Sequence, residues 1–322
     1  MRSTVPPSGR APDPGEDWGL RRIVRRAYPN PSALASDPDY AVDLTVYLTD
    51  MLRPYGLALD PAGMDSRGQS YEEMARVLVE LILPEGEQAD LLVVAYAIPD
   101  IVPARSICVR LSHLCPGVPM AFGIYDQGTA APFTALRLIK QYAGTGEARR
   151  ALLIVLEQSW LPYRPAVPAP VPAGHSGVAL LFGDRAAEPP TRLGHLSRIA
   201  TTAPADAAVL PSAVLPAAIS ALTDAPASGG PAPYATTVIL GPLLAARVPG
   251  SCDLPDTRSG PAGRPYTGLW WELAGELSRS RARPRRFVAA DYDPGSLTLS
   301  LAEFAAAASS LPLSRNQARE TV

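Results

Sequence analysis

The sequence predicts an α/β fold in which helices cover both faces of a mixed β-sheet. Two short runs, residues 91–97 and 151–156, are continuously apolar, which is typical of strands buried on both faces of a sheet. Around them lie segments whose apolar residues recur every three or four positions, as in helices that pack one side on a sheet. This alternation continues on both sides of a proline-rich segment, residues 162–172, and favours a layered α/β protein.

Composition excludes several classes of protein. The 322 residues suffice for one large domain or two closely packed halves. The net charge is −2 and no basic stretch alternates with aromatic residues, so we expect no nucleic-acid partner. No run approaches the ~20 apolar residues of a membrane span and the N-terminus lacks a hydrophobic signal core, so we expect a cytoplasmic protein with no membrane partner. The three cysteines show no paired spacing that would indicate a disulfide framework.

The first half of the chain alternates predicted helices and strands. Residues 1–18 are polar and rich in proline and glycine, and we expect them to be disordered. Helices are predicted at residues 40–52, 70–82 and 104–114. The second of these begins with Ser70 followed by Glu73, which predicts a capping box.

Residues 121–158 carry the most information in the chain. A short apolar strand runs into the turn 125–128, a helix with a small-residue face follows and ends near residue 144, and a second apolar strand comes next. In α/β enzymes such a unit presents a nucleophile at the helix N-terminus, where backbone N–H groups and the helix dipole stabilise negative charge. This turn contains neither Cys nor Ser, so the scaffold for a nucleophile is predicted without the nucleophile.

The second half shares a rough plan with the first. Strands are predicted at residues 177–182 and 236–240, helices at residues 213–222 and 270–277, and a closing hairpin at residues 286–301 around Asp293. We therefore expect two similar halves.

Three stretches, residues 70–100, 121–157 and 173–184, resemble the thiolase-like superfamily and within it the ketoacyl-synthase III branch. They are similar to its helix and buried strand, its nucleophile elbow with the central helix, and the glycine-rich turn that opens its second half. The match covers residues 70–185. The resemblance implies a five-layered αβαβα fold made of two related halves, here residues 19–165 and a shortened 166–322, in a protein that is commonly dimeric and holds no metal or cofactor.

Carried over to this chain, the catalytic positions of that family are replaced. The family's Cys, which holds an acyl group as a thioester, falls at Gly128, or at Gln127 if the turn is one residue shorter. The family's His falls at Gly241 or Pro242, and its Asn falls at Tyr266. The resemblance therefore implies an intact scaffold that lacks the Cys–His–Asn set.

Four side chains remain as candidates for chemistry, each with a plainer alternative. Asp126 is a general base or an N-cap of the following helix. Gln127 donates its amide N–H to an acyl carbonyl, or is a solvated or packing amide. The resemblance adds that some related non-condensing chain-length subunits have a Gln where the family has its Cys. Tyr125 and Tyr266 donate phenolic O–H groups in a pocket, or lie at the edge of the core.

These observations predict a non-catalytic partner subunit of an active ketosynthase, in fatty-acid-like or polyketide-like secondary metabolism. The implied partners are acyl-CoA or an acyl carrier protein, with either a homodimer or a heterodimer with a ketosynthase-like subunit. One alternative is an acyltransferase or condensing enzyme that acts on an acyl thioester without a covalent intermediate and uses Asp126. Another is a small-molecule binding protein that uses the cleft in which the resembling family holds its acyl group.

Overall fold

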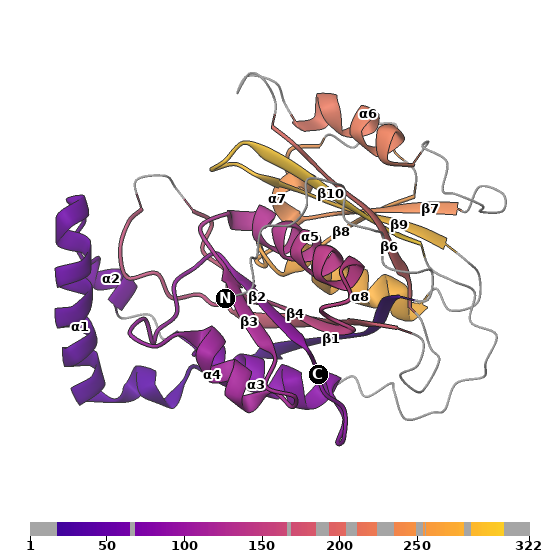
Figure 1. The fold of residues 1–322 in the computed structure, drawn as a ribbon. Helices are drawn as coiled ribbons and strands as arrows, with labels where there is room; N and C mark the ends of the chain where they lie inside the picture. Colours follow the sequence, from indigo (N-terminus) through magenta and orange to yellow (C-terminus); the bar gives the residue numbers. More distant parts are fainter. Residues whose placement is uncertain are drawn as a thin grey trace.

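Ten strands form two five-stranded sheets in the computed structural model, which describes residues 18–64, 68–165, 169–184, 193–203, 211–223, 235–248, 254, 256–279 and 285–305 (Figure 1). The N-terminal segment that we expected to be disordered lies outside the described residues except for Trp18, which is buried against Phe182.

The first sheet has the order β1-β5-β4-β2-β3. Its strands are β1 (Gly19–Tyr28), β2 (Leu91–Tyr96), β3 (Met120–Ile124), β4 (Arg150–Glu157) and β5 (His175–Gly183). Strands β2, β3 and β4 run parallel, whereas β5 runs antiparallel to both of its neighbours. The mixed sheet is therefore confirmed, and its central strands β2 and β4 are the two apolar runs.

The second sheet repeats this plan, since its order β6-β10-β9-β7-β8 is that of the first with every strand number raised by five. Its strands are β6 (His195–Thr202), β7 (Ala235–Leu240), β8 (Asp256–Ser259), β9 (Arg285–Asp293) and β10 (Thr298–Ala305). Strand β10 is the antiparallel member, as β5 is in the first sheet. The first sheet takes in β5, so its strands extend past residue 165, the predicted division, to Gly183.

Helices complete five layers (Figure 1). One apolar cluster lies under each outer helix layer, and a third packs the central helices against both sheets. Helices α3 (Tyr71–Ile82) and α4 (Ile107–Leu114) cover the outer face of the first sheet. Helices α5 (Ala131–Gly144) and α8 (Gly268–Arg279) lie between the two sheets. Helices α6 (Pro211–Thr223) and α7 (Pro242–Ala245) cover the outer face of the second sheet. The αβαβα layering predicted from the sequence is confirmed.

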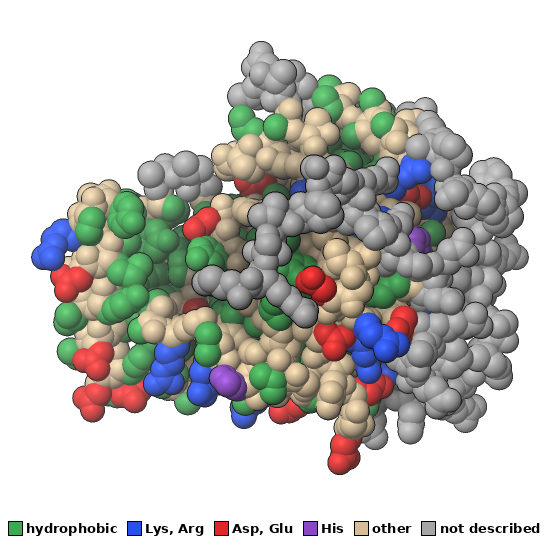
Figure 2. All heavy atoms as spheres, viewed as in Figure 1, with side chains coloured by type: hydrophobic (Ala, Val, Ile, Leu, Met, Phe, Trp, Pro, Cys, Tyr) green, Lys and Arg blue, Asp and Glu red, His purple; other side chains and the backbone are tan. Residues whose placement is uncertain are grey.

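Two smaller helices extend the first half. Helix α1 (Pro38–Leu52) and helix α2 (Pro61–Met64) are anchored on a small cluster that contains Leu48, Ile101 and Trp160. Figure 2 shows hydrophobic side chains across the α1 end of the molecule. Among them Val42 and Val46 on α1 are 64% and 60% exposed.

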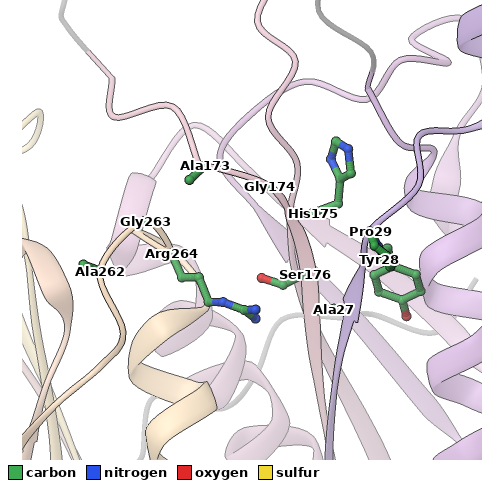
Figure 3. A pocket seen from close by; sticks show the side chains of 10 residues that line it. All are labelled: Ala27, Tyr28, Pro29, Ala173, Gly174, His175, Ser176, Ala262, Gly263 and Arg264. Atoms are coloured by element: carbon green, nitrogen blue, oxygen red, sulfur yellow. The ribbon is translucent and has the colours of Figure 1, made fainter. Parts of the chain in front are cut away.

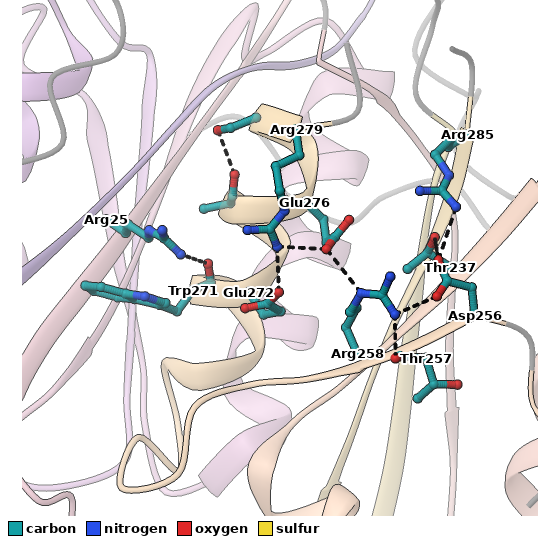
Figure 4. A network of polar contacts seen from close by, with 12 residues as sticks. Arg25, Thr237, Asp256, Thr257, Arg258, Trp271, Glu272, Glu276, Arg279 and Arg285 are labelled. Carbon is teal, nitrogen blue, oxygen red and sulfur yellow. Dashed lines mark hydrogen bonds and ion pairs between the residues drawn. The ribbon is translucent and has the colours of Figure 1, made fainter. Parts of the chain in front are cut away.

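A chain of ion pairs fixes α8 to the second sheet (Figure 4). Glu276 on α8 is 5% exposed and lies 2.7 Å from Arg279 and 3.5 Å from Arg258. Arg258 continues to Asp256 on β8, which also pairs with Arg285 on β9. A buried carboxylate needs such partners, so the network fixes the orientation of a central helix.

Some local predictions were wrong. The capping box at Ser70 does not form, because Glu73 accepts a hydrogen bond from Ser32 instead. Helix α4 begins at Ile107, later than predicted, because the hydroxyl of Ser106 accepts from the amide of Val109 and caps the helix there. No helix in the described part of the chain is long and apolar enough to cross a membrane.

Candidate functional site

The turn between β3 and α5 has an unusual backbone. Asp126 and Gly128 adopt positive φ angles of 60° and 50°, which allow the chain to reverse between strand and helix. A short 3-10 segment, η3 (Gly128–Ala130), then leads into α5. The predicted strand–turn–helix unit is therefore present, and Gly128 occupies the position that the resemblance assigns to a nucleophile.

The space above Gly128 is filled by a carboxylate from the other half of the chain. A Cβ atom built on Gly128 would overlap Oδ2 of Asp293, at the end of β9. The same Oδ2 accepts the amide N–H of Thr129 at 3.1 Å, within the buried interior. Asp293 therefore lies where a side chain at position 128 would project, and only glycine fits beneath it.

Asp293 is held in place by the hairpin that follows it. Its Oδ1 accepts the amide of Ser296 at 2.7 Å and the hydroxyl of Ser296 at 2.9 Å. Asp293 is 7% exposed. The β9–β10 turn thus aims one carboxylate oxygen at the start of α5 and fixes the other.

The second central helix has an equivalent arrangement. Glu157, at the end of β4, is fully buried and accepts the amides of Tyr266 and Thr267 at 2.9 and 3.1 Å, just before α8. It also accepts the hydroxyls of Thr267 at 2.6 Å and Ser176 at 2.7 Å. Burial raises the pKa of Glu157, although these hydrogen bonds oppose the rise.

The two carboxylates form a reciprocal pattern. Strand β4 of the first half ends in Glu157, which binds the start of α8 in the second half. Strand β9 of the second half ends in Asp293, which binds the start of α5 in the first half. Backbone N–H groups at a helix N-terminus are unpaired within the helix and carry partial positive charge. Both helix starts in the central layer are therefore already supplied with an anion from within the chain.

A third carboxylate lies at the position that the resemblance gives to the family's His. A Cβ on Gly241 would overlap the carboxyl group of Asp291 on β9. Asp291 is 2% exposed, and its Oδ1 accepts the amide of the adjacent Tyr292 at 2.9 Å. Burial, aided by the charge of Asp293, raises the pKa of Asp291 well above its usual range.

The residues predicted at the turn are exposed, and one interpretation of them was wrong. Asp126 does not cap the helix, because the amide of Thr129 donates to Asp293 and neither η3 nor α5 has a side-chain cap. Gln127 accepts the hydroxyl of Thr134 at 2.6 Å through its amide oxygen. Tyr125 is 55% exposed and stacks on Tyr96, with 5.7 Å between the ring centroids.

Tyr266 forms its hydrogen bonds with Glu157 and Pro170, away from the Gly128 turn. It is 4% exposed, its hydroxyl donates to the carbonyl of Pro170 at 3.0 Å, and its amide donates to Glu157. Burial raises its pKa, and the charges of Asp293 and Glu157 add to the rise.

Sequence reasoning missed the three carboxylates as site residues. Glu157, Asp291 and Asp293 end buried strands, where a charged side chain is costly unless it has partners. This cost could have marked the three residues in the sequence, because the residues that precede them in β4 and β9 are mostly apolar. Within the described ranges, no group of three His, Cys, Asp or Glu side chains is placed to hold a metal ion.

The two repeated sheets and the central helices form the five-layered αβαβα fold of thiolase-like proteins. Several solved structures share this fold. The chain is similar to OleA from Xanthomonas campestris, with a TM-score of 0.56, 13% identity, and coverage of 90% of this chain and 98% of that one. It is similar to 3-oxoacyl-(acyl carrier protein) synthase III, FabH, from Pseudomonas aeruginosa, with a TM-score of 0.52, 15% identity, and the same coverage.

A third similar structure is the ishigamide ketosynthase/chain length factor, with a TM-score of 0.51, 16% identity, and coverage of 73% of this chain and 80% of that one. No protein-family model matches the sequence, and no curated protein matches it. At these identities the similarity establishes the fold.

Proposed function

We propose that this chain is a non-catalytic subunit that pairs with an active ketosynthase-like protein and shapes its acyl tunnel or stabilises the dimer. The observation that carries the proposal is the carboxylate of Asp293 over Gly128, which fills the place of a nucleophile. The related structures that include a ketosynthase/chain length factor support a partner of this kind.

Electrostatics supports the same conclusion. Thioester condensation needs a thiolate and then an oxyanion, and both are stabilised by the positive end of a helix. Asp293 and Glu157 already accept amide N–H groups at the starts of α5 and α8. A second negative charge beside either carboxylate would be opposed by like-charge repulsion.

A surface for the partner is available at the edge of the first sheet. Among the described strands β3 pairs with β2 alone, so its other edge offers unpaired backbone groups. Apolar side chains surround that edge: Met120 is 45% exposed, Val118 is 65% exposed, and Val109 on α4 is 58% exposed. We infer that this edge forms the homodimer or heterodimer contact.

The test is to purify the chain alone and together with a ketosynthase-like protein encoded beside it, and then to measure mass and acyl-CoA turnover. We expect a stable complex, no turnover by the isolated chain, and no covalent acyl group on its intact mass after incubation with acetyl-CoA. Turnover by the isolated chain that disappears in Asp126→Asn would contradict the proposal.

That contrary outcome would favour the second candidate, an acyl-thioester enzyme without a covalent intermediate. Its supporting observation is that Tyr125 and Asp126 are both exposed at the turn, where a substrate could reach them. Acyl-CoA binding without turnover or partner would instead favour a small-molecule binding protein.

A further inference from the structure

Helix α1, at one end of the molecule, has an outer face that departs from the usual pattern of a surface helix (Figure 1). Its inner side, with Leu44 and Leu48, packs on the small apolar cluster beneath it. The opposite side of such a helix is normally polar. On α1 that side carries Val42 and Val46, both well exposed, among the hydrophobic side chains that Figure 2 shows at this end. An exposed apolar patch of this kind marks an interaction site.

The exposed apolar side chains of α1 form two neighbouring ridges. Val42 and Val46 are one helical turn apart. Tyr47 and Met51, which are 38% and 46% exposed, are one turn apart in the next row. Rows of side chains four positions apart leave a groove between them, and a row of side chains from another helix fits into such a groove. The shape of this face therefore favours a helix as its partner.

Carboxylates alternate with these apolar side chains. Asp39, Asp43 and Asp50 are exposed, and each lies three or four positions from one of the two valines. Asp39 and Asp43 are one turn apart and repel each other, and no described residue forms an ion pair with either of them. Asp50 lies in the last turn, where the helix dipole disfavours negative charge, and its only printed ion pair is with the exposed Arg53 at 3.3 Å. The stability of α1 itself therefore does not account for Asp43 and Asp50.

The pocket where β1 ends and β5 begins shows the more usual arrangement, in which polar side chains have partners within the chain (Figure 3). Among the residues that line it, Tyr28 donates to the carbonyl of Met74 and Ser176 donates to Glu157. By comparison, the carboxylates on α1 are open to a partner from outside the chain.

The charge of the outer face of α1 limits what can cover it. Residues 37–53 contain four aspartates and one arginine, which gives a net charge of −3. A second copy docked through the same face would bring two such charges together, and like charges across an interface oppose binding. An anionic lipid surface would repel the face for the same reason. A positively charged partner is attracted instead.

We propose that the outer face of α1 docks a basic amphipathic helix of a partner protein. Apolar side chains of that helix fill the groove between the two ridges of α1, and its Lys or Arg side chains pair with Asp39, Asp43 and Asp50. The proposal does not rest on the proposed function, because neither the Gly128 turn nor the free edge of β3 takes part in this contact.

Fluorescence anisotropy with two labelled peptides tests the proposal on the full chain. Both peptides have about 18 residues, long enough to form a helix, with leucine on one face. One carries arginine on its other positions and the second carries glutamate there. We expect saturable binding of the arginine peptide that weakens with added salt, and binding of the glutamate peptide at least about tenfold weaker. Equal binding of the two peptides would overturn the proposal.

A double variant tests the apolar ridge. Val42→Ser combined with Val46→Ser should weaken binding of the arginine peptide about tenfold or more. Serine and valine have similar helix propensities and both positions are exposed, so the helix should persist, as circular dichroism can verify. Val171→Ser, at an exposed position outside α1, is the control and should leave binding unchanged. Wild-type affinity in the valine double variant would overturn the proposal.

A second double variant tests the charges. Asp43→Asn combined with Asp50→Asn should weaken binding of the arginine peptide about tenfold and reduce its dependence on salt. Glu80→Gln combined with Glu85→Gln removes the same amount of charge at exposed positions on and after α3, and should leave binding unchanged. If the two charge variants lost affinity equally, attraction to the whole acidic chain would explain the binding, and the assignment to α1 would be wrong.

The valine double variant also distinguishes the other possible occupants of this face. Light scattering measures the mass of the assembly, and sedimentation with phosphatidylglycerol vesicles measures lipid binding. We expect the variant to keep the wild-type mass and expect neither protein to sediment with the vesicles. A lower mass in the variant would assign the face to a second copy, and vesicle binding lost in the variant would assign it to a lipid surface. Either result would overturn the proposal.

Discussion

Gly128 combines two constraints that no other residue type meets. Its φ of 50° is unfavourable for residues with a Cβ, and Asp293 Oδ2 lies where that Cβ would be. Gly146 offers a matched comparison, since its φ is 76° but nothing lies within 4 Å of a Cβ built there. Substitutions at Gly128 and Gly146 therefore separate the free-energy cost of backbone strain from the cost of contact with Asp293.

Gly128→Ala should lower the free energy of unfolding by about 3 kcal/mol, and Gly146→Ala by only about 1 kcal/mol. Urea denaturation measures both values. Adding Asp293→Ala to Gly128→Ala should recover part of the difference, because it removes the overlapping carboxylate. Equal costs for the two glycine substitutions would mean that Asp293 does not occupy this space.

Asp100 predicts a pH dependence of stability. Burial raises its pKa from the ordinary value of 3.8 to about 6, although backbone amides, among them that of Tyr71, oppose the rise. A carboxyl group with a raised pKa favours folding while protonated, so its contribution is complete below pH 4 and is lost as pH rises through 6. The difference between the two pKa values corresponds to about 3 kcal/mol.

Asp100→Asn should therefore flatten the fall in stability between pH 4 and pH 7, because asparagine cannot ionise. Chemical denaturation across this range measures the slope. Asp43→Asn, at an exposed position on α1, is the control and should leave the slope as in the wild type. An unchanged slope in Asp100→Asn would contradict the prediction.

At the scale of elements, the start of α8 depends on one side chain from another strand. Glu157 accepts four hydrogen bonds there with both of its oxygens. Glutamine has a single acceptor oxygen, and its NH₂ group would face donors. Glu157→Gln should therefore cost about 2–4 kcal/mol of stability.

Hydrogen exchange should report the same change as faster exchange in the first turn of α8. Glu272→Gln, on the same helix but in a partly exposed ion pair with Arg279, should cost less than about 1 kcal/mol. If both variants lost the same stability, Glu157 would have no special role at this helix start.

Elements with a strong pattern were predictable, and weakly patterned ones were not. The runs that became β2 and β4 are buried at nearly every position, so their sequence alone indicated strands. Strand β1, which contains four arginines, and strand β8, Asp256–Ser259, carry no such signal. They are strands because a neighbouring strand pairs with them, which is information from distant parts of the chain.

At the scale of the whole molecule, assembly is the property to test first. Met120→Lys places a charge beside the unpaired edge of β3 and should convert a homodimer or heterodimer into monomers. Light scattering during size-exclusion chromatography measures the mass. Val42→Lys, at a more exposed apolar position on α1, should leave the assembly intact. If Val42→Lys dissociated the assembly and Met120→Lys did not, the interface would lie at α1 and not at β3.

By itself the sequence determined the layered α/β class, the two-part plan, and a turn before α5 that lacks Cys and Ser. These follow from local apolar periodicity and from residue identity at one turn, which need no knowledge of distant contacts. Only the tertiary structure decided what fills that turn. Asp293 is 165 positions after Gly128, and Glu157 reaches a helix more than 100 residues further on. The pairing arises because two repeated halves pack face to face and bring the end of each half's strand to the other half's helix.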